Sequence, residues 1–321
     1  MMFRLPGKLV NILPASKWRI LNRKIYFLIC ENNLEVFTVA KRHNLLECAF
    51  VDAAEWFKET DTVIVPVGSC EKHGAHVPLG TDSFTTINVA ERAAKICNVP
   101  YTPLMPFGYS PHHMGRAGEG CGTITLRADT YRAMLLDIAR SLIYHGANKI
   151  VFVTHHGSNT KPIDELLRKI RFEYGAFAAF YKTPTERECE VVAGILEGPP
   201  EETPGWHAGE METAQMMAHD MSLVDMSRAV NDRAHAPEWM GPDFSKKDGT
   251  ITVKFRGSEN IYVPMEHHEY SDHATIGNPF RGTPEKGIAL FEKEAEHLAD
   301  FIEHVKKFPF VVENRYWGDR A

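Results

Sequence analysis

The sequence predicts an α/β fold in which a mostly parallel sheet carries helices on both faces. Short apolar runs, rich in β-branched residues, alternate with longer amphipathic stretches of helical period. Two of these runs, at 62–67 and 149–154, are each followed by a tight polar loop and then by a helical pattern. Such strand–loop–helix units are typical of crossover connections between parallel strands.

The chain is long enough for one elaborated domain with a large core, because it has 321 residues. We place this domain at 51–310, with an insert at about 235–265. Residues 1–50 form an N-terminal extension and 311–321 a C-terminal tail. We find no internal repeat.

The beginning of the chain carries no chemical motif. A strand is predicted at 25–29 and a short helix at 36–46. A further helix is predicted at 52–59, with Asp52 as its N-cap, and it leads into the first strand of the sheet.

The remaining elements follow from periodicity and from breaking residues. Pro100 and Gly146 end two of the helices. Helices are predicted at 83–97, 128–145, 162–174, about 205–219 and 284–307, strands at 62–67, 101–106, 149–154 and 177–181, and a hairpin at 250–263. Between them, residues 107–123 hold five glycines and cannot form a regular element. The aromatic residues and histidines of this loop suit a substrate wall, and a flexible surface loop is the alternative.

Composition excludes several classes of protein. The formal net charge of −6, without a Lys/Arg cluster, argues against a nucleic-acid partner and favours a small molecule. The six cysteines are scattered without a Cys-x-x-Cys pair, which indicates reduced thiols rather than a zinc ribbon or a disulfide scaffold. We see no apolar run of membrane-spanning length and no leader pattern, so we expect a cytoplasmic protein without a membrane partner.

Metal-ligand residue types gather in three loops. The stretch 67–82 follows the first apolar strand and delivers four of them: Glu71, His73, His76 and Asp82. Glu71 and His73 are two apart, so in an extended chain both face one point. Turn residues then let Asp82 return to it. The second loop offers His155 and His156, and the third offers His207, Glu210 and Glu212.

Mixed imidazole and carboxylate donors at strand ends suit Zn²⁺ or Mn²⁺. A pair of metals needs a bridging carboxylate, and Asp82 is the candidate for it. Each histidine taken alone is better explained as an ordinary loop or core residue. Three such loops at the strand ends of one sheet favour a metal centre.

Three motifs together resemble the creatininase (creatinine amidohydrolase) family. They are Glu-x-His-Gly-x-His-x-Pro-x-x-Thr-Asp at 71–82, His-Gly-Ser-Asn at 156–159 and His-Ala-Gly-x-x-Glu-Thr at 207–213. A fourth match, Gly-Asn-Pro at 277–279 with Thr-Pro-Glu-Lys-Gly at 283–287, is similar to the family's C-terminal signature. The resemblance covers about 52–307.

The resemblance implies a creatininase-like three-layer α/β/α sandwich, two divalent metal ions (Zn²⁺ and/or Mn²⁺, or Fe²⁺) and a homo-oligomer, commonly a hexamer. The implied ligands are Glu71, His73, Asp82, His156 and Glu212, with Asp82 bridging. His207 and Glu212 are implied catalytic residues, His207 as a proton shuttle or substrate binder. The candidate substrate-binding residues are Trp206, Tyr109, His112, His113, Arg116 and His155.

The sequence departs from creatininase itself at the second motif. Ser158 stands where creatininase has a carboxylate ligand, and Glu212 looks like its replacement. His155 stands where glycine is usual, so the ligand is either His155 or His156, and the following Gly-x-Asn favours His156.

The implied reaction is attack of a metal-activated water on a carbonyl of a small, cyclic substrate such as a cyclic amide. One alternative is opening of a cyclic keto-inositol (dehydro-inosose) ring in sugar catabolism, which Arg116 and the loop histidines would also suit. A metal-free relative that serves as a binding or scaffold subunit is the alternative outside enzymes.

Overall fold

The structure is a computed structural model, and it describes residues 2–5, 8–11, 25–30, 33–38, 41–184, 191–198, 207–315 and 318. The chain divides into two compact units, one ending at Arg42 and one beginning at His43. Within the first unit, β1 (Met2–Leu5) pairs with β2 (Lys8–Asn11) and β3 (Ile25–Cys30) with β4 (Asn33–Thr38), both antiparallel.

Two predictions for the beginning of the chain need correction. The strand at 25–29 is confirmed as part of β3, but the helix at 36–46 is wrong, because β4 runs to Thr38 and Leu45–Glu47 form a 3₁₀ turn. Every residue of β4 pairs with one of β3, so the strand ladder outweighs a weak helical pattern. Helix α1 (Phe50–Glu59) starts earlier than expected. Asp52 is its third residue rather than its N-cap, and its carboxylate accepts the Ala49 N–H at 3.2 Å.

The central sheet is parallel, in the order β5 (Thr62–Pro66), β6 (Lys149–Thr154) and β7 (Phe177–Lys182). The expected strand at 101–106 lies along the other side of β5, but it forms only single parallel bridges, Tyr101 with Ile64 and Met105 with Val67. Pro103 and Pro106 lack the N–H groups that a continuous ladder requires.

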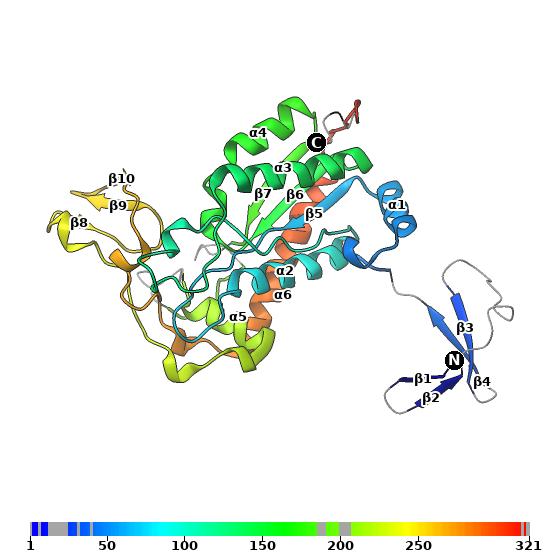
Figure 1. The fold of residues 1–321 in the computed structure, drawn as a ribbon, viewed down its shortest axis with the longest axis horizontal. Helices are drawn as coiled ribbons and strands as arrows, with labels where there is room; N and C mark the ends of the chain where they lie inside the picture. Colours follow the sequence, from blue (N-terminus) through cyan, green and yellow to red (C-terminus); the bar gives the residue numbers. More distant parts are fainter. Residues whose placement is uncertain are drawn as a thin grey trace. The chain divides into compact units, whose positions relative to one another are not determined.

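Helices cover both faces of this sheet, which makes three α/β/α layers (Figure 1). Alternation along β5 sends Val63 and Val65 into a core with α3 (Ala128–His145) and α4 (Asp164–Glu173). Ile64 faces the opposite core, formed with α2 (Thr81–Cys97) and α6 (Pro284–Val305). The predicted helices of this domain are confirmed with shifts of a few residues at their ends.

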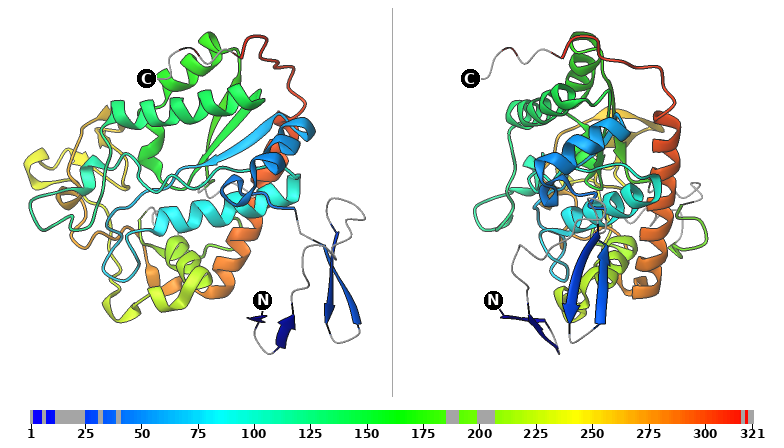
Figure 2. Two further views of the ribbon diagram at one scale, coloured as in Figure 1. Left: turned by 45° about the vertical axis from the view of Figure 1, so that its right-hand side comes forward. Right: turned by 90° about the vertical axis from the view of Figure 1, so that its right-hand side faces the viewer.

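Helix α5 (Glu210–Asp220) packs against α6 and α2 at the side of the sandwich (Figure 2). Gly287 of α6 makes this packing close, because a Cβ there would lie 2.0 Å from the Ala214 carbonyl oxygen of α5. Contact this close leaves no room for a methyl group.

Gly287→Ala is therefore expected to lower the free energy of unfolding by about 1–3 kcal/mol, because α5 and α6 must move apart. Urea unfolding measures it. The control is Ile288→Ala, one residue further along α6 at a side chain that is half exposed, for which we expect a small effect. Equal stability of Gly287→Ala and the parent protein would contradict the packing described.

The insert forms a small antiparallel sheet in the order β10 (Ser258–Tyr262), β9 (Thr252–Phe255) and β8 (Phe244–Ser245). The predicted hairpin at 250–263 is confirmed as β9 and β10, and β8 was not predicted. A separate apolar cluster that includes Val253, Met265 and Tyr270 holds this region together.

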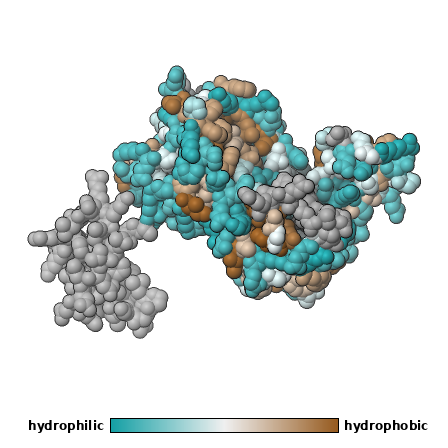
Figure 3. Space-filling model, turned by 180° about the vertical axis from the view of Figure 1, so that it is seen from behind, coloured by the Kyte–Doolittle hydropathy of each residue, from teal (hydrophilic) through white to brown (hydrophobic). Residues whose placement is uncertain are grey.

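The surface seen in Figure 3 carries hydrophobic residues in small patches among hydrophilic ones. Among the described residues, no helix combines the length and the apolar character that crossing a membrane would require.

Candidate metal centre

The carboxyl ends of β5 and β6 bring the three sequence motifs together. Glu71 and His73 lie in the loop after β5, and His155 and His156 directly follow β6. Asp82 and Glu212 come from the first turns of α2 and α5. All six side chains are buried. The arrangement is the one expected where parallel strands end at one edge of a sheet.

One donor group consists of Glu71, Asp82 and His156. His156 lies between the two carboxylates, with Nε2 at 3.2 Å from Glu71 Oε2 and Nδ1 at 3.2 Å from Asp82 Oδ2. A second group consists of His73, Asp82 and Glu212. His73 Nε2 is 3.6 Å from both Asp82 Oδ2 and Glu212 Oε2. Asp82 thus belongs to both groups.

The two adjacent histidines of the second loop are placed differently. His156 is a member of the Glu71 group, whereas His155 is in none of the donor groups found among the described residues. His155 Nδ1 lies 3.6 Å from Asp82 Oδ1 and 3.7 Å from Glu212 Oε1, at the edge of the second group. The geometry therefore favours His156 as the ligand.

Hydrogen bonds hold these donors in place. His73 Nδ1 donates to the Glu71 carbonyl at 3.1 Å, which turns Nε2 toward the carboxylates. Ser69 Oγ donates to Glu71 Oε2 at 2.9 Å. Asn159, from the second motif, donates to the Gly68 carbonyl at 2.9 Å and so ties the loop after β6 to the loop after β5.

Two other ligand-type residues have structural partners. His76 Nε2 lies 2.9 Å from Thr213 Oγ1 and joins the first motif to the third. Glu210 accepts from Lys286 Nζ at 2.7 Å and from two backbone N–H groups, those of Glu197 and Gly198. Neither belongs to a donor group among the described residues.

The charges in this centre are strongly coupled. Burial acts to raise the pKa of Asp82, but His73 and His156 hold that pKa well below its usual value. Burial acts to lower the pKa of His156, but Glu71 and Asp82 raise that pKa well above its usual value. Burial raises the pKa of Glu212. In the metal-free protein these shifts favour ion pairing of the His156 imidazole with the Glu71 and Asp82 carboxylates.

A cavity of about 210 Å³ opens over the centre. Of the candidate substrate-binding residues, His112, His113 and His155 line it, as does His207. Tyr109 lines a neighbouring cavity of about 140 Å³. Arg116 is exposed and lines neither cavity, and Trp206 lies outside the described residues.

Several of the residues that line this cavity were not identified from the sequence. Lys161, Lys182, His267 and Tyr270 all line the cavity. Lys161 directly precedes the helix predicted at 162–174, Lys182 directly follows the strand predicted at 177–181, and the histidine pair at 267–268 lies in a loop after the predicted hairpin. No local pattern shows that these segments reach the strand ends.

Glu294 of α6 is fully buried near the centre, with Oε2 accepting from Gln215 Nε2 at 2.9 Å. Burial raises its pKa to about 8 from an ordinary 4.5, against smaller lowering effects of His155 and Gln215. The folded protein therefore keeps a proton that the unfolded chain loses, and stability falls as pH rises between these two values.

Glu294→Gln, which stays neutral, is expected to flatten this decline. The free energy of unfolding of the metal-free protein would be measured at both ends of this pH range. At the upper end the variant should be more stable than the parent by on the order of a few kcal/mol. Parallel pH profiles of the two proteins would contradict the assignment.

The fold and this centre define an α/β/α protein with a buried carboxylate–imidazole cluster at the carboxyl edge of its sheet. The chain belongs to the creatininase family, described as creatinine amidohydrolase, whose pattern it matches over residues 47–302. This confirms the resemblance carried by the motifs, and it makes the protein a member of a hydrolase family.

Three relatives illustrate the match. Creatinine amidohydrolase of Pseudomonas putida is 30% identical over 191 residues, 56% of this chain and 71% of that protein. A 3-dehydro-scyllo-inosose hydrolase of Thermotoga maritima is 27% identical over 186 residues, 55% of this chain and 56% of that protein. A solved structure of a creatininase with manganese shares the fold, with a TM-score of 0.64 and 22% identity over 84% of this chain and 100% of that one.

Proposed function

We propose that this protein is a metal-dependent amidohydrolase whose centre holds two divalent ions. Glu71, Asp82 and His156 would hold one ion, and His73, Asp82 and Glu212 the other. The observation that carries the proposal is the position of Asp82, whose Oδ2 faces both His156 and His73. A carboxylate shared in this way would serve as the bridging ligand that a two-metal site needs.

The donors present suit Zn²⁺ or Mn²⁺, with Fe²⁺ as a further option, because they are imidazoles and carboxylates without a cysteine. Three carboxylates buried this close together repel one another unless cations compensate them. Asp82 Oδ2 is moreover buried without a well-formed hydrogen bond, and its near neighbours are the His156 and His73 nitrogens at 3.2 and 3.6 Å. A metal-free scaffold role would give the shared position of Asp82 no function.

When bound, such ions polarise a carbonyl and lower the pKa of water. The chain itself would supply a proton carrier. His207 stacks on His73 with ring centroids 4.1 Å apart, and its Nε2 donates to the Lys72 carbonyl at 2.7 Å. Its Nδ1 is then the basic nitrogen. Burial, with the charge of His73, holds the pKa of His207 well below its usual value in the metal-free protein. We assign this imidazole the role of taking a proton at Nδ1 and passing it to a leaving group.

The cavity limits the substrate to a small molecule. The carbonyl to be attacked would lie at the Glu71, Asp82 and Glu212 end. Lys161, Lys182 and Thr250 line the same cavity and would bind polar or anionic groups of the substrate. A cyclic amide, as in the Pseudomonas putida relative, is the first candidate. A cyclic keto-polyol, as in the Thermotoga maritima relative, is the second, and these lysine and threonine side chains favour it.

Turnover by the metal-loaded protein tests the substrate class. The panel would contain creatinine, a formamide and a cyclic keto-polyol, each measured with the parent protein and with Lys161→Met. Hydrolysis of a panel member, with a higher KM in Lys161→Met, is expected. If no carbonyl compound of the panel is hydrolysed by protein that holds metal, the proposed substrate class is wrong.

We also propose a homo-oligomer, with a hexamer as the form that the family resemblance implies. Light scattering would measure the mass of the particle against the 36.3 kDa chain. A monomer at working concentration would contradict this.

A further inference from the structure

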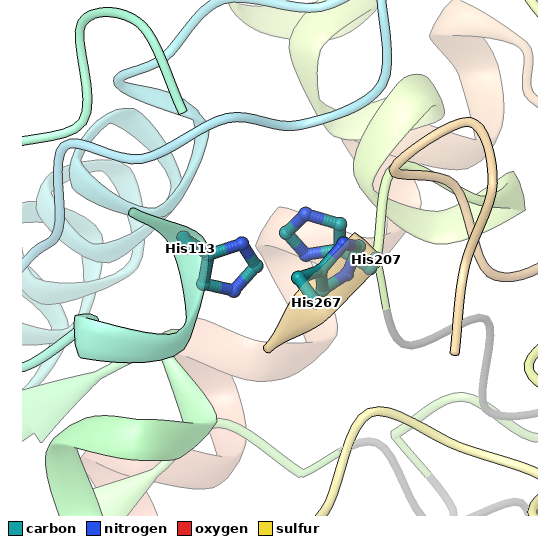
Figure 4. Close-up of side chains that lie close together, drawn as sticks. All are labelled: His113, His207 and His267. Carbon is teal, nitrogen blue, oxygen red and sulfur yellow. The ribbon is translucent and has the colours of Figure 1, made fainter. Parts of the chain in front are cut away.

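Three histidines from separate segments meet beside the two donor groups (Figure 4). His113 ends the 3₁₀ turn Pro111–His113, His207 precedes α5, and His267 begins the 3₁₀ turn His267–Glu269. The three ring centroids lie 4.5–4.7 Å apart, and one nitrogen from each ring lies within 4.8 Å of the others. All three side chains are buried, and all three line the cavity. We call this group the histidine triad.

The ring nitrogens of the triad are arranged as in ligand histidines. His207 uses Nε2 to donate to the Lys72 carbonyl at 2.7 Å, and His113 Nε2 lies 3.2 Å from Glu71 Oε1. Histidines that bind metals usually donate their other N–H to a carbonyl or a carboxylate in this way. The Nδ1 lone pairs of His113 and His207 are then free of those contacts.

The triad also contains polar atoms that lack partners. His113 Nδ1 and both ring nitrogens of His267 are buried without a hydrogen-bond partner among the described residues. Such groups cost free energy unless a ligand satisfies them. A second copy of this arrangement is absent from the described donor groups, since each of the others contains a carboxylate.

We propose that the histidine triad is a third divalent-metal site, selective for Zn²⁺ and other imidazole-preferring ions. Three neutral nitrogen donors suit Zn²⁺, Ni²⁺ or Cu²⁺ and disfavour Mg²⁺ or Ca²⁺, which prefer oxygen. Three protein ligands leave a fourth position open toward the cavity, as in zinc sites that exchange a ligand.

Occupancy of the triad has a consequence for turnover, and this part rests on the proposed function. His207 Nδ1 cannot hold a metal ion and carry a proton at once. Zn²⁺ in excess of the amount that fills the two groups that share Asp82 is therefore expected to inhibit the enzyme, and loss of the triad is expected to relieve the inhibition.

The direct test is the amount of Zn²⁺ bound per chain at a buffered free concentration, measured by elemental analysis. The variant is His267→Phe, which keeps an aromatic ring against Tyr270 but removes both nitrogens. The matched control is His268→Gln, because His268 is the next residue and pairs with Glu119 outside the triad. We expect His267→Phe to bind one equivalent less than the parent, and His268→Gln to bind the same amount.

Equal Zn²⁺ content of His267→Phe and the parent protein would overturn the third site, and would mean that the triad is a packed group of histidines only. A spectroscopic check uses Cu²⁺ added to the zinc-free Asp82→Asn protein. Nitrogen hyperfine splitting that depends on His267 supports the triad. Failure of the two-metal centre would give a different result. The Zn²⁺ equivalents that depend on Asp82 would then be missing from the parent protein and from His267→Phe alike.

Discussion

Replacing Asp82 by Asn is expected to remove both metal ions of the proposed centre and to lower kcat/KM by about a thousandfold or more. The reason is that Asp82 belongs to each of the two donor groups proposed to hold these ions. An amide keeps the shape but loses the negative charge that would bridge two cations. Loss of several kcal/mol of metal-derived transition-state stabilisation corresponds to rate losses of this order. Metal analysis and turnover of the same preparation measure the two effects together.

The matched control is Asp61→Asn, the same substitution just before β5. Asp61 accepts from Lys149 Nζ at 2.9 Å and from Asn148 Nδ2 at 2.8 Å, far from the carboxyl ends of the strands. It is partly exposed, so the variant is expected to lose about 1 kcal/mol of stability and to retain metal and activity. Full metal content in Asp82→Asn would show that Asp82 is not a ligand.

Glu212→Gln is expected to lose one metal ion and to keep the other. Glu212 belongs only to the group with His73 and Asp82, while Glu71, Asp82 and His156 remain intact in the variant. The Glu212 carboxylate also accepts the Ala208 N–H at 2.6 Å, a bond that the oxygen of Gln can keep, so the start of α5 should hold. Turnover should fall by about a hundredfold or more, because both ions are needed to activate water and carbonyl.

Glu210→Gln provides the control two residues away on the same helix. Its carboxylate binds Lys286 and backbone N–H groups and takes no part in the donor groups of the described residues. We expect lower stability with unchanged metal content. If Glu210→Gln rather than Glu212→Gln loses an ion, the ligand assignment on α5 is wrong.

The positions of Glu71, Asp82 and His156 could be anticipated from the sequence because they depend on local order along the chain. Glu71 and His156 follow apolar strands in the chain, and Asp82 lies at the start of the next helix. Parallel strands end at the same edge of the sheet, so these side chains meet there. Alternating strand and helix patterns likewise sufficed for the three layers.

Other features depend on contacts between distant segments. His267 reaches the centre only because the insert folds back beside the loop of His113, and no periodicity encodes that approach. The pairing of β3 with β4 similarly overrides the helical pattern predicted at 36–46. The prolines that interrupt the strand at 101–106 can be read in the sequence. Their effect depends on the neighbouring strand, because they lack the N–H groups that would otherwise donate hydrogen bonds to β5.

The most direct test of the two-metal centre is the metal content per chain of the purified protein after extensive dialysis. Dialysis removes weakly held ions, and competition with a mild chelator would empty the histidine triad first. The proposed centre predicts two equivalents of zinc, manganese or iron that resist this treatment and that Asp82→Asn lacks. A parent protein that holds none, and binds none when Zn²⁺ or Mn²⁺ is added back, would contradict a metal-dependent function for these loops.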